Sequence, residues 1–249
     1  DGAVLDGFTI TGGSADGTGD DGRGGGVFIS GVSMTIKDCI IENNVAYLGA
    51  GIYANADSSA VASTILRNNT ATYSEGRENG GGGIAATGDS RTSMDGCYFY
   101  RNTSGSYGGA LHVKVSQVSV EGCIFEENSI TQVNSNGGCV YVENDNYAGR
   151  VPYFTDCSFT GNSGGYGAAI FLTECYASVI SCTFTGNSAG NGGGAINCYI
   201  ASLDLRHSVF TSNEALGAGA VYFYSQLDGR PVDVFNCLFD RNTVSGNGG

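Results

Sequence analysis

One short motif recurs along almost the whole chain, and its spacing restricts the fold more than any other feature. The motif is a small residue, an aromatic or aliphatic residue two positions later, and an asparagine three positions after that. Its eight copies end at Asn44, Asn69, Asn102, Asn128, Asn162, Asn187, Asn213 and Asn242. The intervals between these asparagines are 25, 33, 26, 34, 25, 26 and 29 residues. A base period near 25 residues with occasional insertions is typical of stacked coils in a solenoid.

Two further apolar columns repeat with the same period. One follows a glycine-rich turn in each repeat, at Val27, Ile52, Ile84, Leu111, Val140, Ile170, Ile196 and Val221. The other stands three positions before the small residue of each motif, at Ile36, Val61, Met94, Val120, Phe154, Val179, Leu205 and Val234. No apolar period of 3.6 residues is present, and the 42 glycines argue against helices. We therefore predict a right-handed parallel β-helix of about nine coils, with three short strands per coil.

The repeat also defines the domain organisation. A partial copy occupies residues 5–13, and the last residues have the composition of the entry to another coil. We therefore expect one β-helix domain over residues 1–249, a fragment truncated at both ends within its repeat array. The eight asparagines are expected in buried turns, where stacked amides bond to each other and to the backbone.

The charge of the chain excludes some partners. Asp and Glu outnumber Lys and Arg by 24 to 11, which gives a formal net charge of −13. Such a surface repels nucleic-acid phosphates and anionic lipid headgroups, so we expect no nucleic-acid partner. No run approaches the roughly 20 apolar residues of a membrane-spanning helix, so we expect no membrane insertion by this fragment. A soluble extracellular surface fits this composition.

Two of the repeated motifs resemble those of the chlamydial polymorphic outer-membrane proteins. The clearest copies are Gly108-Gly109-Ala110-Leu111, Gly193-Gly194-Ala195-Ile196, Phe125-x-x-Asn128, Phe159-x-x-Asn162 and Phe184-x-x-Asn187. The opening segment, residues 4–13, is also similar to large exported bacterial right-handed β-helix proteins. In the polymorphic family these repeats form passenger domains that act as adhesins. The resemblance therefore implies a secreted or cell-surface location and a role in adhesion or display.

Most of the nine cysteines follow the repeat rather than a disulfide pattern. Six of them share the small-residue position with Thr64 and Ser208: Cys39, Cys97, Cys123, Cys157, Cys182 and Cys237. A position that accepts Cys, Ser or Thr requires a small, weakly polar core residue, so we expect buried free thiols. Bridges between adjacent coils remain an alternative, because stacking places neighbouring cysteines within disulfide range.

Aromatic residues recur at the outward position next to the glycine-rich strand. We select six of these aromatics as candidate binding residues: Phe28, Tyr53, Tyr141, Phe171, Tyr222 and Tyr224. A strip of aromatics with neighbouring amides and hydroxyls suits sugar stacking or a protein partner. The alternative is that aromatics one above another simply stabilise the sheet.

Right-handed β-helices also include polysaccharide lyases and glycosidases, whose chemistry requires clustered carboxylates on successive coils. Asp57 and Asp89 share a phase on neighbouring coils, and His112 and Glu143 fall on adjacent coils beside the aromatic strip. These four are the alternative catalytic candidates.

A glycine-rich insertion near the start contains three aspartates that are calcium candidates, Asp16, Asp20 and Asp21. Carboxylate oxygens are the ligands that calcium prefers, although EF-hand spacing is absent. No other cofactor is expected.

Taken together, these patterns predict a non-enzymatic module of a secreted or cell-surface protein, either an adhesin or a rigid structural spacer. Its expected partners are a polysaccharide or a host or matrix surface protein, together with neighbouring coils or domains of the parent chain. The alternative is a polysaccharide lyase or glycosidase of the pectate-lyase-like β-helix class.

Overall fold

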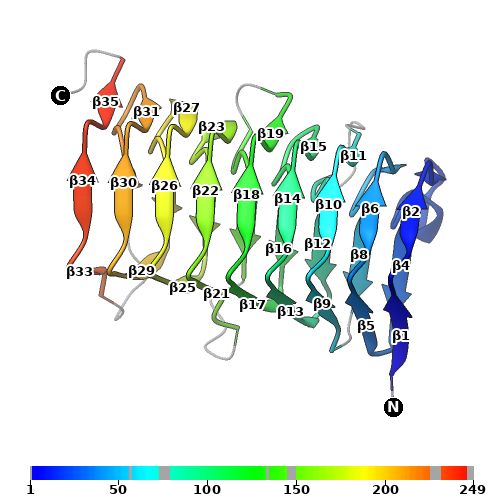
Figure 1. Cartoon of the computed structure of the whole chain (residues 1–249). Helices are drawn as coiled ribbons and strands as arrows, with labels where there is room; N and C mark the ends of the chain where they lie inside the picture. Colours follow the sequence, from blue (N-terminus) through cyan, green and yellow to red (C-terminus); the bar gives the residue numbers. More distant parts are fainter. Residues whose placement is uncertain are drawn as a thin grey trace.

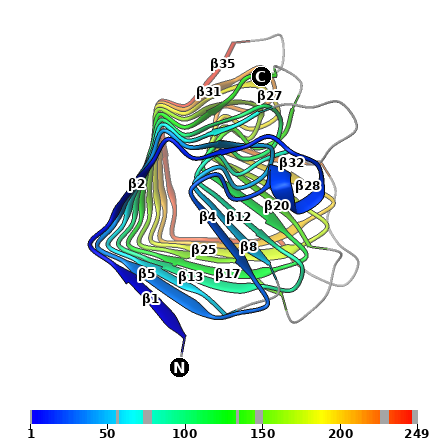
Figure 2. The same cartoon turned by 90° about the vertical axis from the view of Figure 1, so that its right-hand side faces the viewer.

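The computed structural model describes residues 2–55, 58–72, 79–132, 135–144, 150–224 and 231–245, and these form an all-β solenoid (Figure 1). Three parallel sheets of nine strands and one of eight run along it. Each strand pairs with the strand four elements further along the chain, so neighbours in a sheet come from consecutive coils. Viewed along the axis, the coils stack almost directly on one another (Figure 2). No helix among the described residues has the length and hydrophobicity to cross a membrane.

Two of the nine-stranded sheets contain the apolar columns that precede each asparagine. The first sheet consists of β1 (Ala3–Asp6), β5 (Met34–Lys37), β9 (Ala60–Ala62), β13 (Arg91–Asp95), β17 (Gln117–Glu121), β21 (Tyr153–Thr155), β25 (Tyr176–Ile180), β29 (Ser202–Arg206) and β33 (Asp233–Phe235). The second sheet consists of β2 (Thr9–Thr11), β6 (Ile40–Glu42), β10 (Ile65–Arg67), β14 (Tyr98–Tyr100), β18 (Ile124–Glu126), β22 (Ser158–Thr160), β26 (Thr183–Thr185), β30 (Val209–Thr211) and β34 (Leu238–Asp240).

The other two sheets follow each asparagine and lie on either side of the glycine-rich turn. The third sheet consists of β3 (Ser14–Ala15), β7 (Val45–Ala46), β11 (Thr70–Ala71), β15 (Thr103–Ser104), β19 (Ser129–Ile130), β23 (Ser163–Tyr166), β27 (Ser188–Asn191), β31 (Glu214–Ala215) and β35 (Thr243–Val244). The fourth sheet consists of β4 (Val27–Ser30), β8 (Ile52–Asn55), β12 (Ile84–Thr87), β16 (Leu111–Lys114), β20 (Val140–Glu143), β24 (Ile170–Thr173), β28 (Ile196–Tyr199) and β32 (Val221–Phe223). A single turn of 3₁₀-helix, η1 (Gly19–Gly22), lies between β3 and β4.

The predicted coil count and strand count need correction. Each coil contains four strands, not three, because the third sheet is a separate element. Its strands are only two to four residues long and rich in Ser, Ala and Gly, so no two-residue alternation marks them. In each nine-stranded sheet, the seven strands between the first and the last have a neighbouring strand on both sides. The solenoid therefore has about seven fully flanked turns, rather than nine.

A stack of phenylalanines fills the centre of the solenoid. Phe99, Phe125, Phe159 and Phe184 occupy the middle position of successive second-sheet strands and are fully buried. Their ring centroids are 4.6, 4.7 and 4.9 Å apart and their planes nearly parallel. Ile41 and Leu66 occupy the same column in earlier coils. Burial of each ring removes apolar area from water, and stacking adds to this effect, so the column stabilises the centre of the solenoid.

The asparagine ladder lies at the turn between the second and third sheets. In each coil the residue before the asparagine has a left-handed backbone, as at Asn68 with φ of 54°. The Nδ2 of Asn162 donates to Asn187 Oδ1 at 3.0 Å and to the Phe125 carbonyl at 3.0 Å. The backbone N–H of Asn162 also donates to Asn187 Oδ1, at 3.1 Å. The predicted ladder of buried amides is therefore confirmed.

The motif position that six cysteines share also joins neighbouring coils by hydrogen bonds, at the turn between the first and second sheets. The backbone N–H of Cys182 donates to Ser208 Oγ at 3.1 Å, and that of Cys97 bonds to Cys123 Sγ at 3.3 Å. The Cys182 thiol in turn donates to the Ile180 carbonyl at 3.3 Å. Cys, Ser and Thr are interchangeable here because each is a small group that both accepts and donates a hydrogen bond. All nine cysteines are free thiols, and eight of them are buried.

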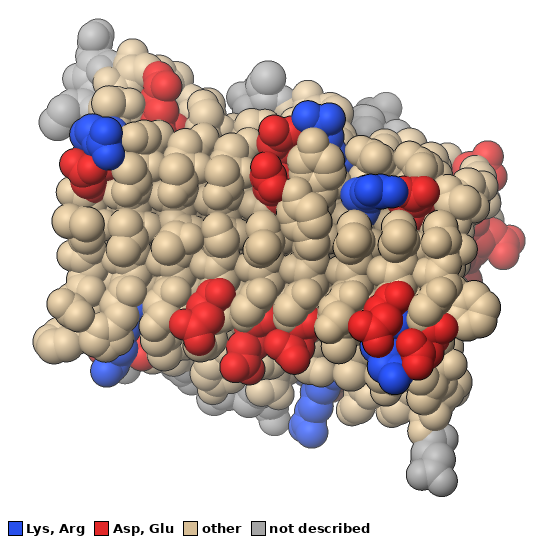
Figure 3. All heavy atoms as spheres, viewed as in Figure 1, with Lys and Arg blue, Asp and Glu red and all other residues tan. Residues whose placement is uncertain are grey.

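Charged side chains on the outer face of the second sheet gather in two bands along its edges, with a largely uncharged band between them (Figure 3). Several of these charges pair across neighbouring coils, as Arg67 does with Glu42 at 2.6 Å and Arg101 with Glu127 at 2.6 Å. The pairs are partly or fully exposed, so each contributes little to stability.

Candidate binding groove

The predicted aromatic strip is the outer column of the fourth sheet, and most of it is covered. The column consists in register of Phe28, Tyr53, Ala85, His112, Tyr141, Phe171, Asn197 and Tyr222. Tyr53, Tyr141 and Phe171 are only 2%, 5% and 4% exposed. The strip is therefore not a continuous exposed surface, and in its middle the aromatics stabilise the sheet as the alternative interpretation expected.

Side chains from the turn between the third and fourth sheets form the cover. Leu48 packs with Tyr53 and Ala85 in one buried cluster. The ring of Tyr107 lies 4.6 Å from that of Tyr141 and 5.9 Å from that of His112. These covering residues stand four positions before the first residue of their fourth-sheet strand, Leu48 before Ile52 and Tyr107 before Leu111.

At the N-terminal end of the column the cover is incomplete. Phe28 remains exposed, and its ring stacks on Tyr53 with a centroid distance of 5.3 Å. The hydroxyl of Tyr53 accepts a hydrogen bond from Thr87 Oγ1 at 3.0 Å, and Arg23 lies over its ring. Neither of these two predicted binding residues lines the groove that forms further along the sheet.

A groove of about 600 Å³ opens over the last coils of the fourth sheet. Its floor comes from β24, β28 and β32, and one wall comes from the ends of β23, β27 and β31 with the turns that follow them. The lining residues are Asn136, Tyr166, Phe171, Asn191, Gly192, Asn197, Tyr199, Leu216, Gly217, Tyr222 and Tyr224. Three of the six predicted binding residues, Phe171, Tyr222 and Tyr224, therefore come together at one site.

A one-residue difference in the turn distinguishes the two coils that complete the groove. The covering residue stands four positions before the fourth-sheet strand in earlier coils, as Tyr166 does before Ile170. Asn191, which pairs with Tyr166, stands five positions before Ile196. The longer turns contain Gly192 and Gly217, which have no side chain to fill the space above the sheet. This spacing is the sequence signal that could have located the groove.

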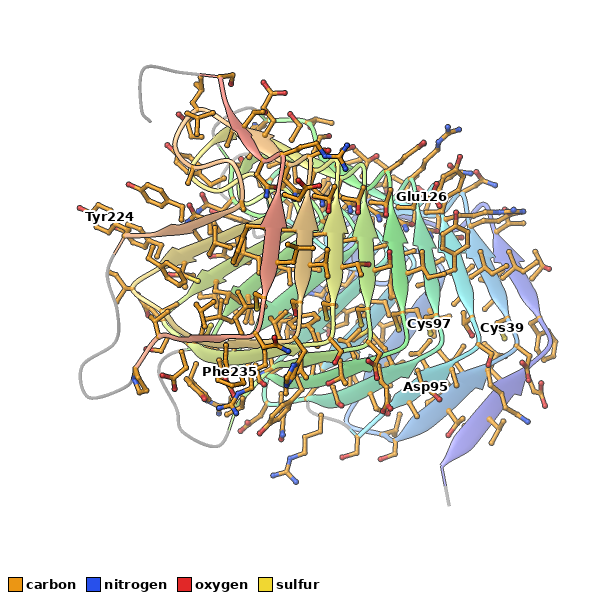
Figure 4. The ribbon with its side chains drawn as sticks, turned by 60° about the vertical axis from the view of Figure 1, so that its left-hand side comes forward. Cys39, Asp95, Cys97, Glu126, Tyr224 and Phe235 are labelled. Carbon is orange, nitrogen blue, oxygen red and sulfur yellow. The ribbon has the colours of Figure 1, made fainter. Side chains whose placement is uncertain are left out.

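Two stacked tyrosines form the exposed wall. The rings of Tyr199 and Tyr224 lie 4.9 Å apart with an angle of 19° between their planes. Tyr199 is 43% exposed and Tyr224 is 64% exposed, and Figure 4 shows Tyr224 projecting away from the ribbon. Two adjacent parallel rings present a flat apolar surface with hydroxyls at its edge.

Asn197 is the polar group at the floor. It is 2% exposed, and its Oδ1 has no hydrogen-bond partner within the part of the chain that the structure describes. Its neighbours in the column, Phe171 and Tyr222, are aromatic. A buried carbonyl oxygen without a partner is destabilising, so its position beside a groove is informative.

The acid–base candidates His112 and Glu143 lie outside the groove, and the histidine is buried. His112 is buried, with its ring edge-on to that of Tyr141 at 5.3 Å. The Tyr141 hydroxyl donates to Glu143 Oε2 at 2.7 Å, and Lys114 Nζ stands 4.0 Å from Glu143. Burial, and then the bond to Glu143, raise the pKa of the Tyr141 hydroxyl far above its usual range. The predicted cluster does form, but its histidine is sealed beneath Tyr107 and Tyr141.

Asp89, one of the two remaining carboxylate candidates, is paired with an arginine. Asp89 accepts a hydrogen bond from Arg150 Nε at 2.8 Å, and this bond lowers the pKa of its carboxyl. Asp57, its predicted companion, lies outside the described residues.

The three calcium candidates lie around η1, in which Asp20 and Asp21 occupy the first turn. Asp20 pairs with Arg23 at 2.8 Å. Among the described residues, no group of three His, Cys, Asp or Glu side chains is placed to hold a metal ion. Asp16, Asp20 and Asp21 therefore do not converge on one site.

No Asp, Glu, Lys, Arg or His belongs to the groove lining among the described residues. The groove therefore offers stacking surfaces and amide or hydroxyl hydrogen bonds, which suit binding of a small ligand, and its described lining contains no carboxylate or imidazole.

The sequence was also compared with known proteins. A family model described as a right-handed β-helix region matches residues 25–199. The comparison with curated proteins found no match.

Proposed function

The chain belongs to the family of right-handed β-helix regions, and from that premise we propose that it is a non-enzymatic recognition module that binds carbohydrate in the tyrosine groove. The observation that carries the proposal is the groove lining, which joins four tyrosines and a phenylalanine to three asparagines. Sugars have an apolar C–H face and a rim of hydroxyls, so they match a stacking surface bordered by amides.

The dimensions of the groove support an oligosaccharide rather than a large protein surface. A volume of about 600 Å³ lies within the range of small-ligand sites. Its walls stand on paired strands of a rigid solenoid, so the aromatic surfaces are held in place before a ligand binds. A preorganised site of this kind binds without a large ordering cost.

The proposed setting is a secreted or cell-surface protein, in which the solenoid is an adhesin module and also a stiff spacer. The strongly acidic composition and the repeats that resemble those of exported adhesins support this setting. A solenoid presents its loops and grooves along a rigid rod, which suits display at a surface.

Cleavage of the bound sugar is the alternative activity, and the lining does not favour it. Glycoside hydrolysis requires two carboxyl groups on either side of the scissile bond, roughly 5–10 Å apart. The lining within the described residues contains none. Glu143 is already engaged with Tyr141.

The proposal is tested by probing the protein on an array of neutral and acidic oligosaccharides and analysing the same sugars for cleavage by mass spectrometry. We expect binding without turnover, and a loss of at least tenfold in affinity when Tyr199 and Tyr224 are both replaced by alanine. The matched control is Tyr153→Ala, an exposed tyrosine of the first sheet. Unchanged binding by the double variant, or cleavage of the bound sugar, would contradict the proposal.

A further inference from the structure

We propose that Asn197 Oδ1 determines the specificity of the groove by accepting a hydrogen bond from one hydroxyl of an uncharged sugar. This inference rests on the proposed carbohydrate binding and identifies the contact that selects the ligand. Hydrogen bonds to buried protein groups discriminate strongly, because a ligand that lacks the donor leaves the buried acceptor unpaired.

Asn197 is a polar residue between two aromatic residues of its column. The outer column of the fourth sheet is apolar or aromatic on both sides of it, at Phe171 and Tyr222. Its Oδ1 is buried and has no partner among the described residues. In the asparagine ladder, by contrast, Asn187 Oδ1 accepts two hydrogen bonds from Asn162. The unpaired Asn197 Oδ1 at the edge of the groove can therefore accept a hydrogen bond from a ligand.

Asn197 Oδ1 lies directly against Gly192. A Cβ placed on Gly192 would overlap Asn197 Oδ1 and would stand 3.2 Å from Tyr166 Cδ1. Any residue other than glycine would therefore displace the amide oxygen from its present position. The terminal torsion of an asparagine side chain is soft, so a small rotation turns Oδ1 toward a hydroxyl in the groove.

The charge of the site selects an uncharged ligand. No Lys or Arg belongs to the described groove lining, so a uronic acid or a sulfated sugar would find no cation there. The net charge of −13 adds a repulsive field for any anionic glycan. A neutral hexose or pentose oligosaccharide needs no cation in the lining and is not repelled by the negative charge of the protein.

The test measures the affinity of the tightest neutral oligosaccharide from the array by calorimetry, for the wild type and for Asn197→Leu. Leucine has a similar volume and suits the apolar column, so we expect a melting temperature no lower than that of the wild type. We expect the affinity to fall about tenfold. The acidic oligosaccharides are expected not to bind either protein.

Monodeoxy derivatives of the same oligosaccharide identify the hydrogen bond itself. One monodeoxy derivative should bind the wild type about as weakly as the parent sugar binds Asn197→Leu. The same derivative should bind Asn197→Leu with the same affinity as the parent sugar does. This non-additivity is the signature of two groups in direct contact. Full additivity for every derivative would overturn the inference.

Gly192→Ala gives a second readout that does not change Asn197. The added Cβ would overlap Oδ1 and displace the amide that accepts from the ligand, so we expect binding to weaken at least fivefold. The matched control is Gly186→Ala, since Gly186 has the same backbone conformation, φ of 62° against 64°, and nothing within 4 Å of its Cβ position. Equal affinities of Gly192→Ala and Gly186→Ala for the sugar would contradict the proposed contact at Asn197 Oδ1.

The outcomes separate this inference from the proposed function. Binding that the Tyr199 and Tyr224 double variant loses, but that Asn197→Leu and Gly192→Ala retain, would overturn the inference and leave the carbohydrate site standing. Binding that survives in all of these variants would overturn both. Tight binding of an acidic oligosaccharide in the groove would overturn the assignment to uncharged sugars.

Discussion

At the scale of single residues, the asparagine ladder is the most demanding part of the fold. Each interior asparagine uses its amide to join three coils, as Asn162 does by accepting from Asn128 and donating to Asn187 and the Phe125 carbonyl. No other side chain has both an acceptor and two donors at this distance from the backbone. The repeated Asn is therefore a chemical requirement of the turn.

Replacement of Asn162 by alanine should be strongly destabilising. It leaves the backbone N–H and the Nδ2 of Asn128, both buried, without their acceptor. At about 1–3 kcal/mol for each unpaired buried group, the free energy of unfolding should fall by about 3 kcal/mol or more. Urea denaturation measures this, with the exposed Thr160→Ala as the control, expected to change stability by less than about 0.5 kcal/mol. A similar small change for Asn162→Ala would contradict the structural role of the ladder.

The thiols should react according to their burial. Eight cysteines are buried and Cys237 is half-buried, so a thiol reagent should modify only Cys237 in the native protein. After unfolding without reductant all nine should react, because all are free. Mass spectrometry of the labelled protein counts the modified residues. Fewer than nine labels after unfolding would reveal disulfide bridges and contradict the hydrogen-bonding role of the cysteine position.

Alkaline pH should destabilise the fold through the same thiols. Burial raises the pKa of the Cys175 thiol from 9.0 to about 12. The folded state therefore holds a proton that the unfolded chain releases above pH 9, and stability is lost as the pH rises from 9 toward 12. The limiting slope is about 1.4 kcal/mol per pH unit for each such thiol. Urea midpoints measured from pH 8 to 10 test this, and Cys175→Ser should reduce the slope.

At the scale of the elements, the central column explains why both aliphatic and aromatic residues occur at the same motif position. Leu66 and Phe99 are direct neighbours in the second sheet, so the column tolerates either shape where the flanking coils fit it. In the middle of the column the phenylalanine rings stack in parallel over several coils.

Phe159→Ala should therefore cost about 3–5 kcal/mol, because it opens a cavity between two stacked rings. Phe159→Leu fills most of that space and should cost less than half as much. Thermal and urea denaturation give both values, and Phe235→Ala, at an exposed position of the first sheet, is the control with little effect. Equal costs for the alanine and leucine variants would contradict this prediction, because they would show that the lost side-chain volume does not set the cost.

Three of the four sheets could be predicted from the sequence, since long apolar columns such as that of Ile36 mark their inward faces. The third sheet could not, because a strand such as Val45–Ala46 is too short to show alternation and is fixed by pairing with its neighbours. For the site, the aromatic positions Tyr222 and Tyr224 were predictable from their phase. The burial of Tyr53 and Tyr141 could not be predicted in this way. The residue that faces each of them comes from the turn between the third and fourth sheets, and its identity changes from coil to coil, as at Leu48, Gly80 and Tyr107.

At the scale of the whole molecule, the solenoid makes local differences independent of one another. Each coil contacts mainly its two neighbours, so the fold survives a changed turn as long as the inward columns continue. The extra glycine in two consecutive turns can therefore open a groove over β24, β28 and β32 without disturbing the phenylalanine stack beneath it. A rigid repeat with one altered region is a suitable scaffold for a recognition site.

The most direct test of this account is to map the binding site by ¹H–¹⁵N NMR while titrating the tightest neutral oligosaccharide. We predict chemical-shift changes confined to the groove, at Asn197, Tyr199 and Tyr224 and at the turns containing Gly192 and Gly217, with the sugar recovered intact. Changes centred instead on the uncharged band of the second sheet or on the His112–Glu143 region, or the appearance of cleaved sugar, would contradict a non-catalytic carbohydrate site in the tyrosine groove.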